Sequence, residues 1–489
     1  MRNKFKILFV DVIDRNINLQ RAYPHLGIGY LVSSLRAAFN DLDILVVNRN
    51  PLGHIKRLRP DILALSSVTQ NFTLAKSIAR ETKRINPSLP VIVGGAHVSQ
   101  LPESMDMSMD IGIIGEGEET FVELIRHIRD NSVSPDTLGS VKGLAFWREN
   151  KIDRAEPRGA ISQLDKLPHP ERSILPEKEN QLLLTSRGCP FRCAFCASSF
   201  FWRGIRYFSP DYVLEEVSRI VKDYPVLNLT IYDDLFISDK KRLEEISAKI
   251  TQAGYHKRIS FWCMARADLI DEETIGYLKR MNVKGVGMGL ESGSDRVLAA
   301  IKSDNISAET NRRAIELCKK NGVLVHGSFM LGCPFEKEED MLKTRDFIVN
   351  SRIDKGEISV ATPLPGTSFW EYALKEKMVS SEMEWSRLAI RYMDELPEGE
   401  DFLLLSKEVP RKRFIAIFRQ IAEALELKRN EYDKKWGAMQ GKEMKLTKFF
   451  SLMSLKKLIR DPRRGLRYAM NFFLSVPRRF LTDKDSGHA

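Results

Sequence analysis

Apolar and polar positions follow two different periods along the first part of the chain. Short runs rich in β-branched residues recur there, and stretches with apolar residues at helical spacing separate them. The runs expected to form strands are Ile7–Val10, Ile44–Val47, Ile62–Leu65, Val91–Val93 and Ile111–Ile114. Because strands that are apolar on both faces are typical of parallel sheets covered by helices, residues 1–145 are predicted to form a doubly wound α/β domain.

A second series of strands and helices begins at Leu182, after a segment rich in proline and charge. The prolines of this segment, which interrupt regular structure, are Pro157, Pro168, Pro170 and Pro176. Residues 146–180 are therefore predicted to be a linker. The later apolar runs are Leu182–Thr185, Leu229–Tyr232, Ile259–Cys263, Val286–Leu290, Val325–Leu331 and Ile358–Ala361. These βα units predict a partial (β/α)6 TIM-like barrel over residues 181–372, with catalytic groups at the carboxyl ends of its strands.

The C-terminal region has a different pattern and carries most of the charge imbalance. Strand patterns end near residue 372, and residues 373–489 are expected to be helical. The chain has a formal net charge of +11, and segment 442–484 alone holds twelve Lys or Arg against three Asp or Glu. Its apolar residues recur at helical spacing. The segment is predicted either to lie on an anionic membrane surface or to pack on the barrel with a solvated basic face.

Composition argues against several other classes of protein. The chain has no run of eighteen apolar residues, so no membrane-spanning helix is predicted. No recognised nucleic-acid-binding fold surrounds the basic residues, so nucleic acid is not expected as a partner. Six cysteines in 489 residues, without a secretory leader, fit a reducing compartment, and we expect a cytoplasmic protein without disulfides.

Three of the cysteines lie close together, directly after the first expected barrel strand. Cys189, Cys193 and Cys196 are separated by three residues and by two. Thiolates at this spacing can bind three irons of a cubane iron–sulfur cluster, and no fourth cysteine is near enough to bind the last iron. A structural zinc site is a weaker interpretation, because it needs four closed ligands and the other cysteines have no paired spacing.

The CxxxCxxC array resembles the signature of the radical S-adenosylmethionine (radical SAM) superfamily. Segments 23–30, 93–97 and 114–118, which precede the array in this order, resemble the cobalamin-binding domain joined to such enzymes. The resemblance is to enzymes of the hopanoid methylase and anaerobic magnesium-protoporphyrin ester cyclase type. It implies an N-terminal Rossmann-like cobalamin-binding domain and three cofactors, which are a 4Fe-4S cluster, S-adenosyl-L-methionine and cobalamin. The three cysteines would be both the metal ligands and the catalytic centre.

The resemblance also assigns cofactor contacts to residues near the strand ends. Those expected to hold S-adenosylmethionine are Phe195, Asp233, Asp234, Arg266, Glu291 and Ser292. Those expected near cobalamin are Ser66, Thr69, Gly94, Gly95, Gly115, Glu116 and Gly117. Chemically, a carboxylate suits the methionine ammonium, a guanidinium suits the methionine carboxylate, and an aromatic ring can stack on adenine. For Arg266, a structural pair with Asp268 is an equal alternative.

One motif of many cobalamin domains is absent. Those domains carry Asp-x-His-x-x-Gly after the first strand, and the histidine binds cobalt from below. Segment 11–16 of this chain reads Asp-Val-Ile-Asp-Arg-Asn instead. We therefore expect cobalamin to bind with an open lower face, and a domain that has lost cobalamin remains the alternative.

The resemblance implies that a reduced cluster passes one electron to the sulfonium of S-adenosylmethionine, which yields a 5'-deoxyadenosyl radical. That radical removes hydrogen from an unactivated carbon, and methylcobalamin then supplies a methyl group. The expected activity is cobalamin-dependent C-methylation of a lipid-like or tetrapyrrole substrate. The expected partners are a small-molecule or lipid substrate, a reducing electron donor such as flavodoxin or ferredoxin, and the inner face of the membrane as a peripheral surface.

Three other functions remain open at this stage. An oxidative cyclase of the anaerobic magnesium-protoporphyrin ester cyclase type would use the same motifs without methyl transfer. A cobalamin- or cluster-based sensor would bind the cofactors without turnover. A methylthiotransferase acting on RNA is less favoured, because the N-terminal region lacks the additional cysteines needed for a second cluster.

Overall fold

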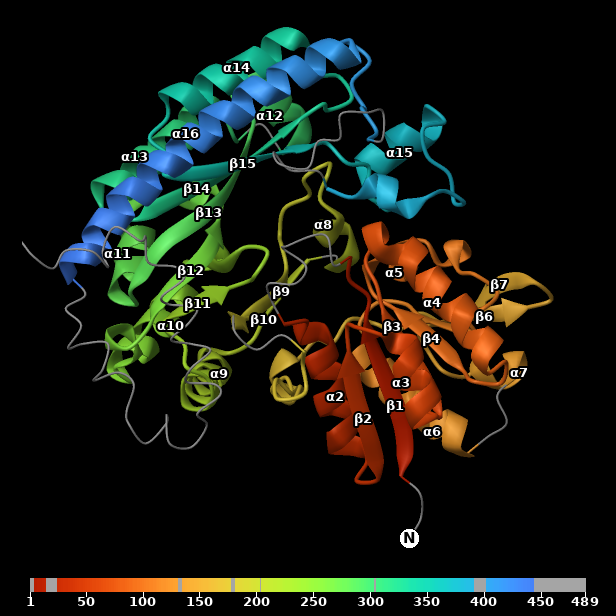
Figure 1. Ribbon diagram of the computed structural model, residues 1–489. Coiled ribbons are helices and arrows are strands. Elements are labelled where there is room, and N and C mark those ends of the chain that lie inside the picture. Colours follow the sequence, from red (N-terminus) through yellow and green to blue (C-terminus); the bar gives the residue numbers. More distant parts are fainter. Residues whose placement is uncertain are drawn as a thin grey trace, which may run out of the picture. The chain divides into compact units, whose positions relative to one another are not determined.

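The computed structural model describes residues 4–14, 24–130, 134–176, 181–202, 204–302, 305–390 and 402–443. Residues up to Lys428 belong to one compact unit, which contains two large β-sheets and the helices around them (Figure 1). Among the described residues, no helix is both long enough and apolar enough to cross a membrane.

The first sheet has seven strands in the order β2-β1-β3-β4-β5-β6-β7, of which the first five run parallel. They are β1 Phe5–Asp11, β2 Leu42–Val47, β3 Ile62–Ser66, β4 Val91–Gly94, β5 Ile111–Ile113, β6 Leu144–Arg148 and β7 Lys151–Arg154. The strand order reverses between β1 and β3, and doubly wound sheets bind ligands outside the carboxyl ends of strands at such a point. The antiparallel strands β6 and β7 extend the sheet past residue 145, where the domain is expected from the sequence to end.

Helices cover both faces of this sheet, because successive residues of a strand point to opposite faces. Ile7 and Phe9 of β1 pack in the same cluster as α2 and α6, whereas Leu8 and Val10 pack with α3 and α4. The helices are α2 Leu26–Ala38, α3 Pro51–Leu58, α4 Phe72–Ile85, α5 Ala96–Gln100, α6 Gly117–Asp130 and α7 Pro135–Leu138. The predicted doubly wound α/β fold is confirmed.

The second sheet has six parallel strands in the order β15-β14-β13-β12-β11-β8, with helices on its outer face (Figure 1). The strands are β8 Leu182–Leu183, β11 Asn228–Ile231, β12 Ser260–Ala265, β13 Val283–Glu291, β14 Leu324–Leu331 and β15 Lys355–Val360. The helices are α9 Pro210–Asp223, α10 Lys240–Gln252, α11 Glu272–Arg280, α12 Asp295–Ile301, α13 Ala308–Lys320 and α14 Glu338–Asn350. The predicted partial barrel is confirmed.

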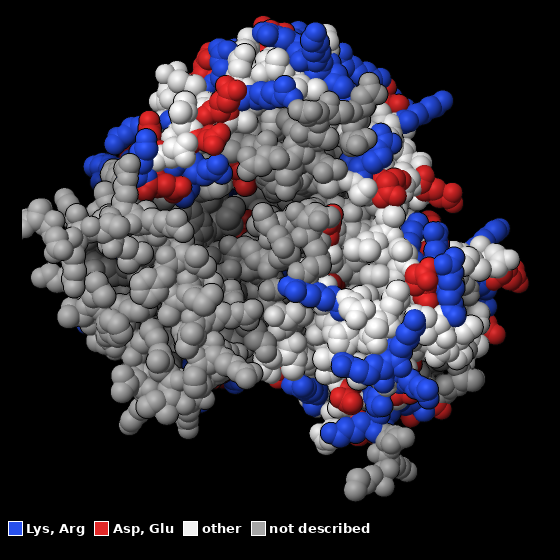
Figure 2. Space-filling view, viewed as in Figure 1, with Lys and Arg blue, Asp and Glu red and all other residues white. Residues whose placement is uncertain are grey.

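The part of helix α16 (Arg411–Glu443) that lies before Arg429 packs in the core of the barrel, near the edge strand β15. A methyl group on Gly356 of β15 would come within 2.7 Å of Leu425, so helix and strand are in close contact. The basic segment 442–484 lies outside the described residues, except for its first two residues, which end α16. On the face shown in Figure 2, Lys and Arg side chains are intermixed with Asp and Glu.

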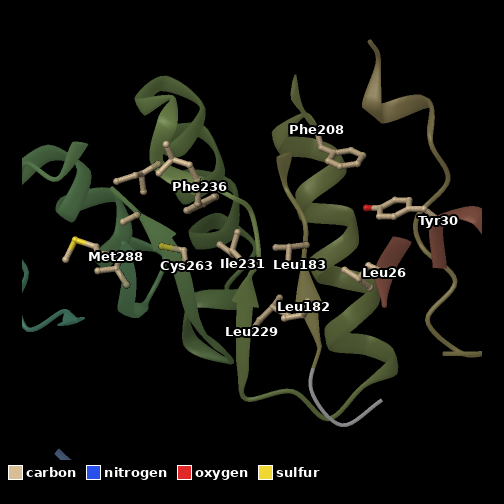
Figure 3. Packing of buried hydrophobic residues seen from close by; sticks show 14 of the residues in the cluster. Leu26, Tyr30, Leu182, Leu183, Phe208, Leu229, Ile231, Phe236, Cys263 and Met288 are labelled. Carbon is tan, nitrogen blue, oxygen red and sulfur yellow. The ribbon is translucent and has the colours of Figure 1, made fainter. Parts of the chain in front are cut away.

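A continuous apolar core joins the two sheets (Figure 3). Leu26 and Tyr30 of α2 belong to the same cluster as Leu183 of β8, and Tyr30 stacks on Phe208 with ring centroids 6.1 Å apart. The expected linker is also attached to the barrel, because its buried Arg172 forms an ion pair with Glu216 of α9. The first domain is therefore fixed against the edge of the barrel at β8.

Candidate functional site

The three cysteines lie in a loop between the short strand β9, Ser186–Gly188, and helix α8, Ala197–Trp202. Strand β9 pairs antiparallel with β10, Ile205–Tyr207, which anchors the start of the loop. The loop is also held in its middle, because the Ala194 N–H donates to the Ile301 carbonyl at 2.8 Å. The half-buried free thiols of this loop are those of Cys189, Cys193 and Cys196.

The surroundings of these thiols disfavour their ionised form when no cation is bound. Burial raises the pKa of Cys189 to about 11, and the charges of Asp234 and of the other two thiols add to that rise. Burial also raises the pKa of Cys193 and of Cys196. Thiols must lose their protons to bind a metal, so bound iron would supply the positive charge that stabilises the three thiolates.

The donor set fits a cluster better than a single ion. Within the described part of the chain, no three side chains of His, Cys, Asp or Glu converge on a site for one metal ion, the cysteines of the loop included. In a cubane cluster each thiolate binds a different iron, so the ligands do not have to meet at one point. Three thiols in one loop therefore suit a 4Fe-4S cluster that keeps one iron open.

Arg266 and Lys302 bring positive charge to the cysteine loop. Arg266 follows β12, and it donates from Nη1 to Sγ of Cys193 at 3.7 Å and from Nε to Asp268 at 2.9 Å. Its guanidinium also lies over the ring of Phe191, 3.7 Å from the centroid. The charge of Lys302 opposes the effect of burial on the pKa of Cys193. The alternative Arg266–Asp268 pair is thus present, together with a contact to the loop.

The two aspartates after β11 have different roles. Asp233 is buried, and its carboxylate accepts the N–H and the hydroxyl of Thr185 and the hydroxyl of Ser186. It fixes the turn from β8 to β9. Asp234 is exposed and accepts a hydrogen bond from the Ser198 hydroxyl at 2.5 Å. Of the pair, Asp234 is the exposed one, and its contact with the methionine ammonium stays a prediction.

Glu291 has an unusual backbone at the end of β13. Its φ of +62° lies in the left-handed region, which is uncommon for a residue other than glycine and recurs at functional sites. Burial raises the pKa of its carboxyl group, and Lys302, 3.5 Å away, opposes that rise. Glu291 also acts electrostatically on Cys193, so it lies beside the cysteine loop.

Ser292 and Phe195 are held by contacts within the protein. Ser292 is fully buried, and its hydroxyl lies 2.9 Å from that of Thr344 on α14, so it joins the loop after β13 to that helix. Phe195 is half-buried, and its ring centroid lies 6.3 Å from that of Phe369 on α15, Ser368–Lys375. The ring of Phe195 therefore packs toward α15 at one side of the cysteine loop.

A cavity of about 490 Å³ opens at the carboxyl ends of the first sheet. Loops after β3, β4 and β5 form one wall, which includes every residue expected near cobalamin: Ser66, Thr69, Gly94, Gly95, Gly115, Glu116 and Gly117. The opposite wall comes from the barrel and the region of the cysteine loop, with Gly188, Ala197, Ser198, Trp202, Tyr232 and Asp234. One cavity thus connects the strand ends of the first domain with the cysteine loop.

The first wall suits the close approach of a large, flat group. Gly95 has φ +113°, and a Cβ there would lie 2.3 Å from the carbonyl oxygen of Ser67, so only glycine lets these two loops meet. Gly115 has φ +81°, and a Cβ there would meet no atom within 4 Å. Its bare backbone therefore faces open space. Small residues around an open cavity at the switch point of the sheet fit cobalamin.

Two residues of this wall also have partners within the protein. Burial acts to raise the pKa of Glu116, but Arg206 and Arg187 hold it below its usual range. The two guanidinium groups lie 2.7 and 2.5 Å from the carboxylate. Glu116 is therefore a bridge between the first domain and the β9–β10 pair. The hydroxyl of Thr69 lies 3.2 Å from Nδ1 of His97. Burial lowers the pKa of His97 to about 3, so this imidazole is a neutral core residue.

Reasoning from the sequence missed three residues of the site. Arg187 and Lys302 lie outside the quoted motifs, and His25 lies in segment 23–30 but was given no role; each is joined to the site by a contact that the fold creates. His25 lines the cavity and lies 2.8 Å from the carboxylate of Asp11. Local patterns give no signal for such contacts, because they arise only when the chain folds.

Comparison with known proteins agrees with this geometry. The family model of the radical SAM superfamily matches residues 183–348, and that of the B12 binding domain matches residues 15–125. An uncharacterized methyltransferase of Pyrococcus horikoshii is 32% identical over 381 residues, which cover 74% of this chain and 81% of that protein.

Two more distant similarities are informative. The anaerobic magnesium-protoporphyrin IX monomethyl ester cyclase of Cereibacter sphaeroides is 23% identical over 372 residues. The match covers 72% of this chain and 60% of the cyclase, so this chain spans less than two thirds of that relative. The structure of the radical S-adenosylmethionine methyltransferase TsrM from Kitasatospora setae, with cobalamin and a 4Fe-4S cluster bound, matches with a TM-score of 0.65 at 17% identity. That match covers 76% of this chain and 75% of TsrM, and it supports the shared fold.

Proposed function

Because this chain belongs to the radical SAM enzymes that carry a B12-binding domain, we propose that it transfers a methyl group from cobalamin to an unactivated carbon of its substrate. Its cofactors are a 4Fe-4S cluster, S-adenosyl-L-methionine and cobalamin, and its substrate is a small molecule. The relative from Pyrococcus horikoshii is named as a methyltransferase, which supports this reaction class.

The observation that carries the proposal is the shared cavity. Gly94 and Gly115 lie on one wall, and Ser198 and Asp234, next to the cysteine loop, lie on the other. A cofactor on the first wall and a substrate held near the loop would face the same space. Holding two reacting groups in one site removes the entropic cost of bringing them together for each transfer.

The residues of the chain would mainly place and shield these groups. The three thiolates would hold the cluster and leave one iron for the methionine moiety, while Asp234 would meet the methionine ammonium. When bound, the cluster supplies one electron to the sulfonium of S-adenosylmethionine, and cobalamin supplies the methyl group. Trp202 and Tyr232 add apolar surface to the cavity, which limits access of water to the reacting groups.

We infer a substrate with a large apolar surface, either lipid-like or a tetrapyrrole. Val68 and Tyr232 line the cavity, and they are 43% and 52% exposed. Large apolar side chains usually avoid such contact with water. A substrate that covers them would remove this surface from water. The relative from Cereibacter sphaeroides is named for a magnesium-protoporphyrin ester, which supports the tetrapyrrole choice.

S-adenosylmethionine with a trideuterated methyl group tests the proposed transfer. Anaerobically reconstituted protein, loaded with cobalamin and reduced, is mixed with lipid or tetrapyrrole extracts, and the products are followed by mass spectrometry. Methyl transfer predicts S-adenosylhomocysteine, 5'-deoxyadenosine and a product that has gained the labelled methyl group. Protein reconstituted without cobalamin is the matched control.

Two other outcomes would contradict methyl transfer and identify a rival function. Release of 5'-deoxyadenosine with an oxidised product and no S-adenosylhomocysteine would indicate oxidative cyclisation. Binding of all three cofactors without any 5'-deoxyadenosine would indicate a sensor.

We further propose a reducing protein such as flavodoxin or ferredoxin as the electron donor, and an anionic membrane surface as the contact of segment 442–484. The charge of that segment and its helical apolar spacing support the membrane contact. Co-sedimentation of the full chain with phosphatidylglycerol vesicles, compared with neutral vesicles, tests it. Equal binding to both kinds of vesicle would contradict this contact.

A further inference from the structure

Asp11 and His25 form a pair at the cavity, in the first domain. Asp11 ends β1 and His25 directly precedes α2, and the imidazole Nδ1 lies 2.8 Å from the carboxylate Oδ1. The side chain of Asp11 is 10% exposed, whereas that of His25 is 37% exposed. Because His25 lines the cavity and Asp11 does not, the carboxylate lies behind the imidazole as seen from that space.

The second ring nitrogen of His25 is left uncovered. Within the residues that the structure describes, Nε2 of His25 has no hydrogen-bond partner. Gly27 also lines the cavity, and a Cβ at that position would come within 3.3 Å of Nε2. The glycine therefore keeps the space beside Nε2 open. His25 is also the single histidine among the described residues that line this cavity.

The pair fixes the tautomer of the imidazole. The Asp11 carboxylate accepts the proton on Nδ1, so the lone pair of the neutral ring lies on Nε2. Histidines that bind metals almost always donate their other ring N–H to a carboxylate, a carbonyl or water, which orients the ring and raises its basicity.

We infer that His25 binds the cobalt of cobalamin through Nε2, from the face turned toward the first domain, with Asp11 as the positioning residue. The lone pair of Nε2 forms the bond and replaces the nucleotide base that cobalamin carries, and no electron is gained or lost. A histidine beyond segment 11–16 thus fills the lower face that is expected from the sequence to be open. This inference rests on the cobalamin binding that the proposed function requires.

Electron paramagnetic resonance of the full chain loaded with Co(II) cobalamin tests this bond directly. A coordinated ¹⁴N nucleus splits each cobalt line into a triplet, whereas ¹⁵N gives a doublet, because the two nuclear spins differ. Protein grown with ¹⁵N-histidine and loaded with unlabelled cobalamin should therefore show doublets. Triplets would place the nucleotide base on cobalt, and unsplit lines would show no nitrogen ligand, and either result would overturn the inference.

Variants identify which histidine supplies the nitrogen bound to cobalt. His25→Ala should lose the splitting, whereas His54→Ala, on the exposed side of α3, should keep it. Asp11→Asn should weaken cobalamin binding by about 10- to 100-fold, as loss of the carboxylate behind a metal-binding histidine does elsewhere. If His25→Ala fails to fold, the labelled wild-type protein still decides.

Failure of this inference can be told from failure of the proposed function. Cobalamin held without a histidine nitrogen on cobalt would contradict the inference alone, and methyl transfer could still be measured. A chain that retains no cobalamin would contradict both.

Discussion

Arg266 donates from Nη1 to Sγ of Cys193 across 3.7 Å, and this contact places a permanent positive charge beside a thiol that is proposed to bind the cluster. Asp268 fixes the guanidinium from its other side. Hydrogen bonds to the sulfur ligands and the local charge set the reduction potential of iron–sulfur clusters. The potential of this cluster should therefore depend on a residue at the end of β12, outside the cysteine loop.

Arg266→Gln should make the midpoint potential of the cluster more negative by about 60 mV. A charged hydrogen bond worth about 1.5 kcal/mol corresponds to a shift of this size for a one-electron couple. A redox titration followed by electron paramagnetic resonance measures the shift. Arg258→Gln, which changes an exposed arginine beside Tyr255, is the matched control and should leave the potential unchanged. Equal potentials in the two variants would contradict the role of Arg266.

Gly115 and Gly254 form a matched pair for the cobalamin site. Their φ angles are +81° and +77°, and a Cβ at either position would meet no atom within 4 Å. Alanine should cost about 1–2 kcal/mol of backbone strain at both positions. Only Gly115 lines the cavity, so only Gly115→Ala should also weaken cobalamin binding. Absorbance titration of the apoprotein with hydroxocobalamin measures this, and equal affinities would argue against cobalamin at this wall.

Arg187 is predicted to stabilise the joint between the two domains. It is 6% exposed and binds both Glu116 and Glu118, so Arg187→Ala would remove the arginine bound to the buried Glu118 and leave Glu116 with Arg206 alone. We expect a loss of about 3–5 kcal/mol of stability, seen as a lower thermal midpoint in calorimetry. Arg219→Ala, which removes an exposed pair with Glu215, should cost less than about 1 kcal/mol. Similar midpoints for the two variants would contradict this role.

Glu216 is predicted to make the protein sensitive to acid. Burial acts to raise the pKa of this carboxyl group, but His169 and Arg172 hold it below its ordinary value of 4.5. Its contribution to stability is therefore complete above pH 4.5 and is lost as the pH falls through the lower pKa of the folded state. The difference in thermal midpoint between wild type and Glu216→Gln should shrink below that pH.

The exposed neighbour Glu215 provides the control for this pH dependence. Glu215→Gln, on the same helix, should change the thermal midpoint little at any pH, because exposed ion pairs contribute little to stability. The prediction is contradicted if the difference in thermal midpoint between wild type and Glu216→Gln stays constant from about pH 6 to about pH 3.5.

Element types could be predicted from the sequence where local signals agree. Helix α9, Pro210–Asp223, has such signals, because Ser209 caps its first turn and proline suits its first position. Strand β8 is shorter than the predicted run Leu182–Thr185. The Thr185 N–H donates to the side chain of Asp233, so it is not available to a neighbouring strand.

The roles of side chains at the strand ends could be predicted only in part. The topology of parallel sheets brings loops after neighbouring strands together, so the loops with Gly94 and Gly115 meet at one cavity. Asp233 and Asp234 are adjacent in sequence, yet one is buried in a turn and the other faces the cavity. The missing motif after β1 gave no hint of His25, because its contact with Asp11 depends on how α2 packs beside β1.

Release of 5'-deoxyadenosine tests most directly the central claim that the three cysteines hold a cluster open to S-adenosylmethionine. Anaerobically reconstituted and reduced wild-type protein should release it. Cys189→Ala, Cys193→Ala and Cys196→Ala should not, whereas Cys318→Ala, at a buried cysteine of α13 outside the loop, should keep the activity. Wild-type protein with a full complement of iron that releases none, or loop variants that release as much as wild type, would contradict the claim.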